Sequence, residues 1–118
     1  MDFVWLAGRL LFSSVFIVSA LGNLKDLEHT TKMAASSGAP FPKLLSLFAS
    51  LLALLGGLSI AFGYQAEIGA IFTLLFLLPV TFMVHRFWKY SDPMAVGNHR
   101  GHFWKNIGLI GGAMFILS

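Results

Sequence analysis

The sequence predicts an all-α integral membrane protein, a four-transmembrane-helix bundle with a polar loop 1 and a longer loop 3 on one face. Apolar residues make up 57 % of the 118-residue chain and charged residues 11 %, whereas soluble domains carry about 25 % charged residues. The few charges leave long uncharged tracts that are continuous instead of alternating, which excludes lipid-exposed strands. Soluble, disordered and collagen-like classes are therefore excluded.

Four uncharged tracts place the helices at about 3–24, 44–63, 68–88 and 103–118, in one domain of residues 1–118. The uncharged run at the second of these positions extends over 44–66, 23 residues or roughly 35 Å as a helix, enough for a hydrocarbon core of about 30 Å. The last apolar run is the shortest, so the aromatic residues at its start must help it to cross. The first is expected to be a retained helix, because the basic region that a cleaved signal peptide requires is weak.

Lys and Arg side chains set the expected orientation. Apart from Arg9, all of them lie in loop 1 (25–43) or loop 3 (85–105). The positive-inside rule then places both loops in the cytoplasm and both termini outside. We expect a multi-pass protein of the bacterial inner membrane that contacts lipid, and the net charge of +3 gives no indication of nucleic-acid binding.

Loop 1 is predicted to hold a short helix over 26–36, or an extension of the first helix. Glu28 and Lys32 are spaced four apart there, in the favourable order. Gly38 and the two prolines after it should keep the chain non-helical until about Lys43.

Three further sites in the sequence predict a local change in the path of the backbone. In loop 3, Asp92-Pro93 and Gly97-Asn98 predict turns. In the third helix, Pro79 removes a backbone donor and is expected to kink the helix.

Small residues recur at helical spacing in the second and fourth helices. They let helix backbones approach closely where lipid offers no hydrophobic drive for association. We expect them to pack helices within the bundle, and a docking face for another membrane protein is the alternative. The predicted packing residues are Ala49, Ala53, Gly57, Gly108 and Gly112.

Arg9 is the charge predicted to lie inside a membrane span. It can extend to the outer interface or line a polar pocket. Glu67 is one of the few acids on the same expected side. We therefore predict an ion pair between Arg9 and Glu67.

A head-group site is predicted on the cytoplasmic face, where the third helix ends and the fourth begins. Imidazole, amide and ammonium groups donate hydrogen bonds, and an indole adds an apolar face. Helix capping and loop anchoring by the same residues remain the alternative. The candidates are His85, Trp88, Lys105, Asn106 and Lys25.

The sequence gives no nucleotide-binding glycine loop and no nucleophile–base signature. Cysteine is absent, which excludes thiol and Cys-ligated metal chemistry. His99 and His102 have the spacing of a metal pair in a helix, but the surrounding cations disfavour a metal. We predict neither catalytic residues nor a metal site, and an enzymatic activity is left open.

The order of several short motifs resembles the DoxX family of small four-helix bacterial membrane proteins. The motifs are Arg9-Leu-Leu-Phe12, Ser19-Ala-Leu-Gly-Asn-Leu-Lys25, Gly38-Ala-Pro40, Leu55-Gly-Gly-Leu58, Phe62-Gly63, His85-Arg-Phe-Trp88, and Phe103-Trp-Lys-Asn106 followed by Gly111-Gly112. The resemblance implies association with membrane oxidoreductase assemblies, such as a thiosulfate–quinone oxidoreductase. The sequence departs from the family at Ala53, where similar proteins often carry a glutamate.

The hypothesis that follows is an accessory membrane subunit of a quinone-linked redox complex, with no redox centre of its own. Quinone is the candidate ligand, and other membrane-protein subunits are the candidate partners. Two alternatives remain open, a structural or assembly subunit that packs against a larger complex, and a small transporter. Transport is disfavoured because the spans contain a single charge.

Overall fold

The computed structural model describes residues 2–85 and 87–118, without the side chain of Asp2, and this part of the chain is helical with no strand. Arg86, one of the cations used to predict the orientation, lies outside the described residues. The elements in order are α1 (Asp2–Lys25), α2 (Leu27–Ser36), α3 (Pro42–Phe62), α4 (Ala66–Pro79), a π-helical segment (Val80–Val84), a 3₁₀ turn (Phe87–Lys89) and α5 (Pro93–Leu117).

Three stretches of the described chain are long and apolar enough to cross a membrane. They are Phe3–Lys25, Pro42–Phe62 and Ala66–Lys89. α5 has 25 residues but is not among them, because its first part is polar. The all-helical membrane class is confirmed, and three of the four expected spans are found.

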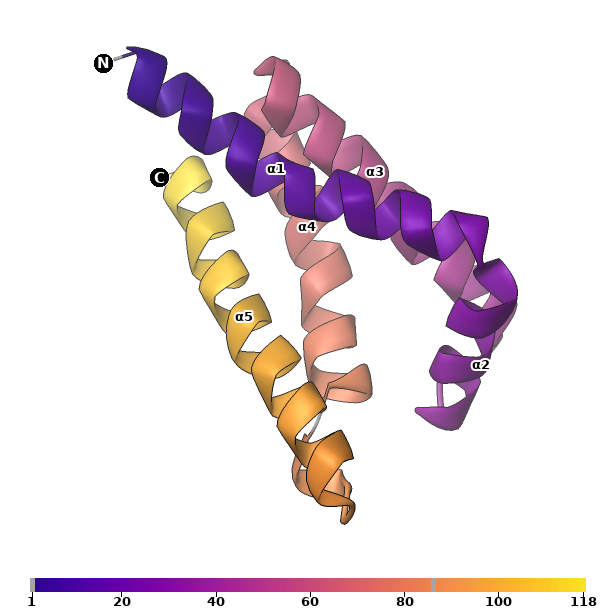
Figure 1. Cartoon of the computed structure of the whole chain (residues 1–118). Helices are drawn as coiled ribbons and strands as arrows, with labels where there is room; N and C mark the ends of the chain where they lie inside the picture. The colour runs from indigo at the N-terminus through magenta and orange to yellow at the C-terminus, as the bar shows by residue number, and fades with distance from the viewer. Residues whose placement is uncertain (1, 86) are drawn as a thin grey trace.

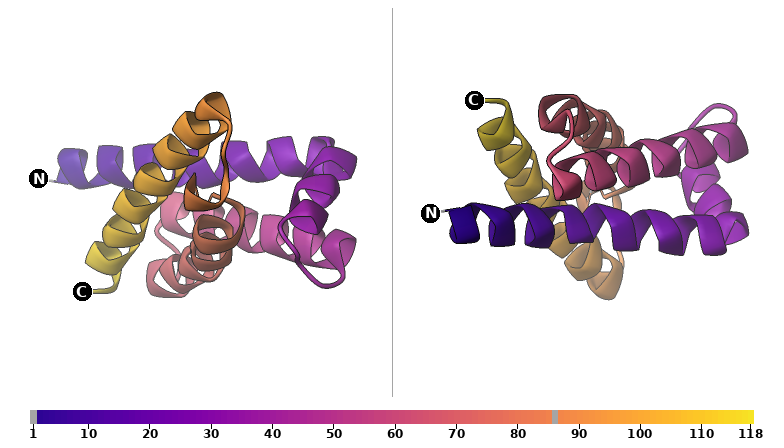
Figure 2. Two further views of the ribbon diagram at one scale, coloured as in Figure 1. Left: turned by 90° about the horizontal axis from the view of Figure 1, so that it is seen from below. Right: turned by 90° about the horizontal axis from the view of Figure 1, so that it is seen from above.

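The helices form two pairs that diverge from a common end. Figure 1 shows α1 and α3 running together toward α2, while α4 and α5 run together in another direction. Both termini lie at one end of the molecule, and we call the part on this side the terminal half. Figure 2 shows α5 crossing α1 obliquely. We call the opposite, divergent part the loop end, because it holds residues 25–45, 84–85 and 87–106.

The core lies where α1, α3 and α4 meet. Phe16 and Ala20 of α1 are buried against Ala53 of α3 and against Phe76 and Leu77 of α4. The ring centroids of Phe16 and Phe76 are 6.4 Å apart in an edge-to-face arrangement. The predicted packing residue Ala53 is fully buried here, and its small side chain lets α1 approach α3 and α4.

Glycines bring the helices of the terminal half into closest contact. A Cβ atom at Gly56 would lie 2.8 Å from the carbonyl oxygen of Gly69, so α3 and α4 touch through their backbones. A Cβ at Gly57 would lie 2.9 Å from Cγ1 of Ile17 on α1. The sequence analysis singled out Gly57 but missed the contact between Gly56 and Gly69.

The other predicted packing residues differ in how closely they approach a neighbouring helix. A Cβ at Gly112 would lie 2.6 Å from Cε1 of Phe12, so α5 approaches α1 there. A Cβ at Gly108 would have no other described atom within 4 Å. Ala49 is partly buried and packs against the core cluster.

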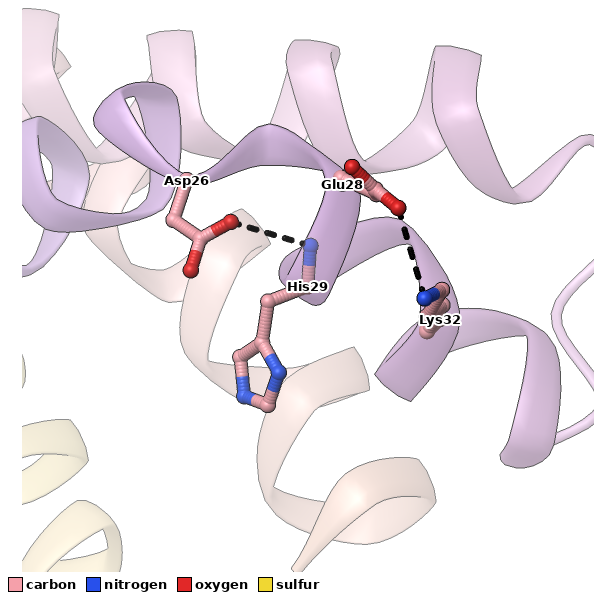
Figure 3. Close-up of polar contacts among 4 residues, drawn as sticks. All are labelled: Asp26, Glu28, His29 and Lys32. Carbon is pink, nitrogen blue, oxygen red and sulfur yellow. Dashed lines mark hydrogen bonds and ion pairs between the residues drawn. The ribbon is translucent and has the colours of Figure 1, made fainter.

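Loop 1 folds as the short helix that its sequence predicts. The carboxylate of Asp26 accepts a hydrogen bond from the backbone N–H of His29, at 3.3 Å, and begins α2. Lys32 Nζ lies 3.3 Å from Glu28 Oε1, as Figure 3 shows. The helix ends at Ser36, and Gly38 follows with a φ of +84°.

The regular α-helix of the third span ends at Pro79, the residue that was expected to kink it. The next five residues form the π-helical segment, and the His85 N–H donates to the Val80 carbonyl at 3.1 Å. A π turn changes the helix face on which later residues lie, and such turns are frequent at functional sites. Here it precedes His85.

The start predicted for the fourth helix, at about residue 103, is wrong, because α5 begins at Pro93 and occupies much of the expected loop 3. Asp92 Oδ2 accepts a hydrogen bond from the Ala95 N–H at 3.0 Å, and Pro93 occupies the first turn. Asp followed by Pro is a helix-start signal as well as a turn signal. Gly97 and Asn98, predicted as a turn, lie inside the helix that this cap begins.

Candidate functional site

A cavity of about 560 Å³ separates the two helix pairs at the loop end. Its walls are mostly apolar and come from α1, α2, α3, α4 and α5. Phe16, Leu77 and Leu109 are among the apolar residues that line it. Ligand sites in proteins have volumes of about 300–1,000 Å³, so this cavity is large enough for a small organic molecule.

One side of the cavity carries a group of nitrogen-bearing side chains. His85 lines it just after the π-helical segment, and His102, Lys105 and Asn106 line it from α5. Asn106 is 4 % exposed. The sequence analysis predicted His85, Lys105 and Asn106 as a head-group site, and the structure brings these three to one cavity.

Polar groups also line the cavity on α1, α2 and α3. The Thr30 hydroxyl donates to the Asn23 carbonyl at 3.3 Å, and the Ser46 hydroxyl donates to the Thr30 carbonyl at 3.5 Å. The buried hydroxyl of Ser50 also lies in the cavity wall and has no hydrogen-bond partner within the described chain. A ligand oxygen that accepts a hydrogen bond would satisfy it.

Three histidine rings meet beside the cavity. His85 Nδ1 and His99 Nδ1 are 3.1 Å apart, and the His85 and His102 rings stack with centroids 4.8 Å apart. His99 also stacks on Tyr90, with centroids 4.2 Å apart and planes within 4° of parallel. The Tyr90 hydroxyl in turn donates to the Val84 carbonyl at 3.3 Å. The loop end is therefore held together by ring contacts.

The electrostatics of this group favour a neutral His102. Burial lowers the pKa of His102, and the nearby Lys105 ammonium and His99 lower it further. Lys105 Nζ lies 3.4 Å from His102 Nδ1, a distance at which the ammonium donates to a neutral ring. The positive charge of Lys105 is thus held at the edge of the cavity, where it attracts an electron-rich oxygen.

Two of the predicted head-group residues lie outside the cavity lining. Trp88 packs edge-to-face on Phe103 with ring centroids 5.4 Å apart, in an aromatic group at the start of α5. Lys25 is exposed in the last turn of α1. Trp88 therefore serves the alternative that the sequence left open, anchoring of the segment between α4 and α5.

The direct ion pair predicted between Arg9 and Glu67 is wrong. Within the described side chains, no nitrogen–oxygen contact of 4.0 Å or less joins them. A Cβ at Gly63 would lie 2.9 Å from Arg9 Nη1, so the guanidinium lies against the C-terminal end of α3. The partial negative charge of a helix C-terminus attracts it there, whereas Glu67 is exposed at the N-terminus of α4, which stabilises an acid.

Arg9 also lines a second cavity, of about 450 Å³, between α1 and α5. Its other lining residues are apolar and include Trp5, Phe12 and Gly112. Arg9 thus lines a pocket, one of the two positions that the sequence left open, although the other residues lining it are apolar and not polar.

The sequence analysis missed Asn23, Thr30 and Tyr90. A signal for the first was present, since Ser19 and Asn23 are spaced four apart and so share one face of α1. Thr30 gave no signal, because its place in the wall depends on how α2 folds back onto α3. A group of three or more metal-ligating side chains is not found among the described residues.

Comparison with known proteins agrees with the membrane class of the chain. A family model described as DoxX matches residues 4–86. The inner membrane protein YphA of Escherichia coli (strain K12) is 24 % identical over 111 residues, which cover 94 % of this chain and 79 % of that protein. No solved structure gives a significant match.

Proposed function

The chain belongs to the DoxX family, and from this premise we propose that it is an accessory inner-membrane subunit of a quinone-linked redox complex. The observation that carries the proposal is the cavity at the loop end, with its polar group of His85, His102, Lys105 and Asn106. The similarity to a bacterial inner membrane protein supports the location. Electrons would come from a partner subunit, since the proposed role requires no redox centre in this chain.

The size and the lining of the cavity suit a quinone. A quinone ring is apolar on its faces and carries two carbonyl oxygens at opposite edges. The walls offer apolar contacts, while Lys105 and Asn106 offer N–H donors to one carbonyl, and the Ser50 hydroxyl has no other partner in the described chain. Few, well-placed donors in an otherwise apolar pocket are typical of cofactor sites.

Extraction of quinone from the purified protein tests this proposal. We expect quinone to copurify with the wild type, and His85→Ala and Asn106→Ala each to weaken its affinity about tenfold, the effect of losing roughly 1.4 kcal/mol of binding free energy, so that less quinone copurifies. His29→Ala is the matched control, because His29 is exposed on α2. Wild-type protein without quinone, and variants that lose only stability, would instead support a structural or assembly subunit.

We also propose that the apolar half of α5 completes a bundle of four spans, with loops 1 and 3 in the cytoplasm. The common position of both termini supports an even number of crossings. Cysteines at Gln65 and Gly97 should then be labelled from opposite sides by an impermeant thiol reagent. Both positions are exposed. Labelling of Gly97→Cys from outside intact spheroplasts would contradict this orientation.

A further inference from the structure

We infer that His85 and His99 form a proton relay between the cavity and the cytoplasmic side of the loop end. The inference rests on the proposed quinone function and adds a path for the protons that quinone chemistry requires. Reduction of a quinone to a quinol takes up two protons with two electrons, and oxidation releases them. A ligand bound between these mostly apolar walls has few polar groups within reach, so protein side chains must help it to exchange these protons with water.

The Nδ1 atoms of the two rings are close enough for a direct hydrogen bond. His85 Nδ1 and His99 Nδ1 are 3.1 Å apart, which is a hydrogen bond between two atoms of the same kind. One ring must therefore donate its Nδ1 proton while the other accepts it. This leaves Nε2 of each ring as its second site for a proton. Because His85 lines the cavity, its Nε2 is the nitrogen available to a ligand.

The surroundings hold His99 in place for this exchange. Its ring stacks on Tyr90, and the Tyr90 hydroxyl donates to the carbonyl of Val84, one residue before His85. The two ends of the relay are thus fixed to the same short stretch of backbone. His99 lies in the polar first part of α5 and, within the described chain, is not part of the cavity lining.

The charged and titratable groups around the pair favour one shared proton. His102 stacks on His85 from α5, and Lys105 donates to His102. Because Lys105 keeps a positive charge close by, a second proton on the pair would add repulsion between like charges. Tyr90 presents its ring face to His99 and donates its own proton elsewhere.

Proton transfer through this pair balances atom by atom. For uptake, water gives a proton to His99 Nε2, His99 Nδ1 passes its proton to His85 Nδ1, and His85 Nε2 releases one to the reduced quinone oxygen. Each ring gains one proton and loses one, so neither changes its charge overall. The transfer leaves both rings in the opposite tautomer, and both must return to the first tautomer, by turning or by exchanging a proton with water, before the second proton follows the same path. Release from a quinol uses the same atoms in the opposite order.

Oxidation of a bound short-chain ubiquinol by ferricyanide tests the relay in nanodiscs. Two ferricyanide ions are reduced, one quinone forms and two protons leave. Loss of the hydroxyl proton precedes rapid electron removal, so the rate reports on the base. We expect His99→Phe, which keeps a ring against Tyr90 but has no nitrogen, to bind ubiquinol as the wild type does and to oxidise it at least about tenfold more slowly. Added imidazole should restore part of the rate.

His29→Phe is the matched control and should leave the rate unchanged. An unchanged rate in His99→Phe with normal ubiquinol binding would overturn the relay and leave the proposed function standing. A slow rate that imidazole does not restore would also overturn it, because the substitution would then act through structure. Failure of the wild type to bind ubiquinol would overturn the proposed function and the relay with it.

Discussion

The terminal half and the loop end of this protein use small and polar residues in opposite ways. In the terminal half, α3 and α4 touch through the backbones of Gly56 and Gly69, and Gly57 brings α3 against α1. At the loop end the same helices separate, and polar residues line a cavity of about 560 Å³ between them. Glycine contacts therefore fix where the helices meet, and their divergence beyond that point leaves the space.

This difference has a physical basis in the membrane. Between helices in lipid, stabilisation comes from close packing and from hydrogen bonds, because lipid is as apolar as the helix surface. Where a cavity separates membrane helices, neither close packing nor hydrogen bonds between the helices stabilise the fold. The terminal half must then supply much of the packing stability, and the loop end is the part that can be altered for ligand binding.

The largest expected effect is in the terminal half. In Gly69→Ala the new Cβ would lie 2.8 Å from Ser59 Cβ and 2.9 Å from the carbonyl oxygen of Gly56. We expect a loss of about 1–3 kcal/mol in the free energy of unfolding, because a backbone contact cannot yield without separating the helices. Unfolding in mixed micelles, followed by circular dichroism, measures it.

Gly108→Ala is the control for that substitution, because a Cβ at Gly108 has open space around it. Its effect should stay within about 0.5 kcal/mol. Equal destabilisation by the two substitutions would show that the contact between α3 and α4 does not determine the result, because Ala has a higher helix propensity than Gly and cannot destabilise a helix through propensity.

The next effect concerns the loop end, where ligand binding should change more than stability. Ala49→Phe adds a ring to the cavity wall. We expect at least about a tenfold loss of bound quinone and a change below about 1 kcal/mol in the free energy of unfolding, because the ring enters existing space. Equilibrium dialysis and thermal unfolding give the two values. Ala35→Phe, on the exposed face of α2, is the control, and normal quinone binding by Ala49→Phe would place the ligand elsewhere.

The sequence predicted the membrane-spanning helices better than it predicted the structure of the loop end. Uncharged tracts gave α1, α3 and the third span, because hydrophobic length depends on the sequence alone. The start of α5 was missed, since Asp92-Pro93 has the same local chemistry in a turn as in a helix cap. Gly97-Asn98 then gave a false turn inside that helix.

The candidate site was predicted in part for a similar reason. His85, Lys105 and Asn106 lie at the ends of two helices joined by one connection, so their proximity followed from topology. Trp88 lies in the same connection but packs on Phe103. The direction of its side chain depends on its rotamer and on the 3₁₀ turn, which the sequence did not predict. The partner of Arg9 was mispredicted because the analysis considered acidic side chains and not a helix C-terminus.

The smallest expected effect is the pH dependence that His102 gives to the loop end. Its pKa in the folded protein is lowered from the usual value of 6.5 by burial and by Lys105. The unfolded chain therefore binds a proton first as the pH falls, so the free energy of unfolding should decrease below about pH 6.5 and level off below the folded-state pKa. Solvent screening keeps this decrease small, because the ring is largely exposed. Melting temperatures between pH 8 and pH 5 should fall less in His102→Gln than in the wild type. Gly69→Ala should instead lower the melting temperature by a similar amount at every pH. A steeper fall in His102→Gln would mean that the protonated ring stabilises the loop end, and would reverse the sign assigned here.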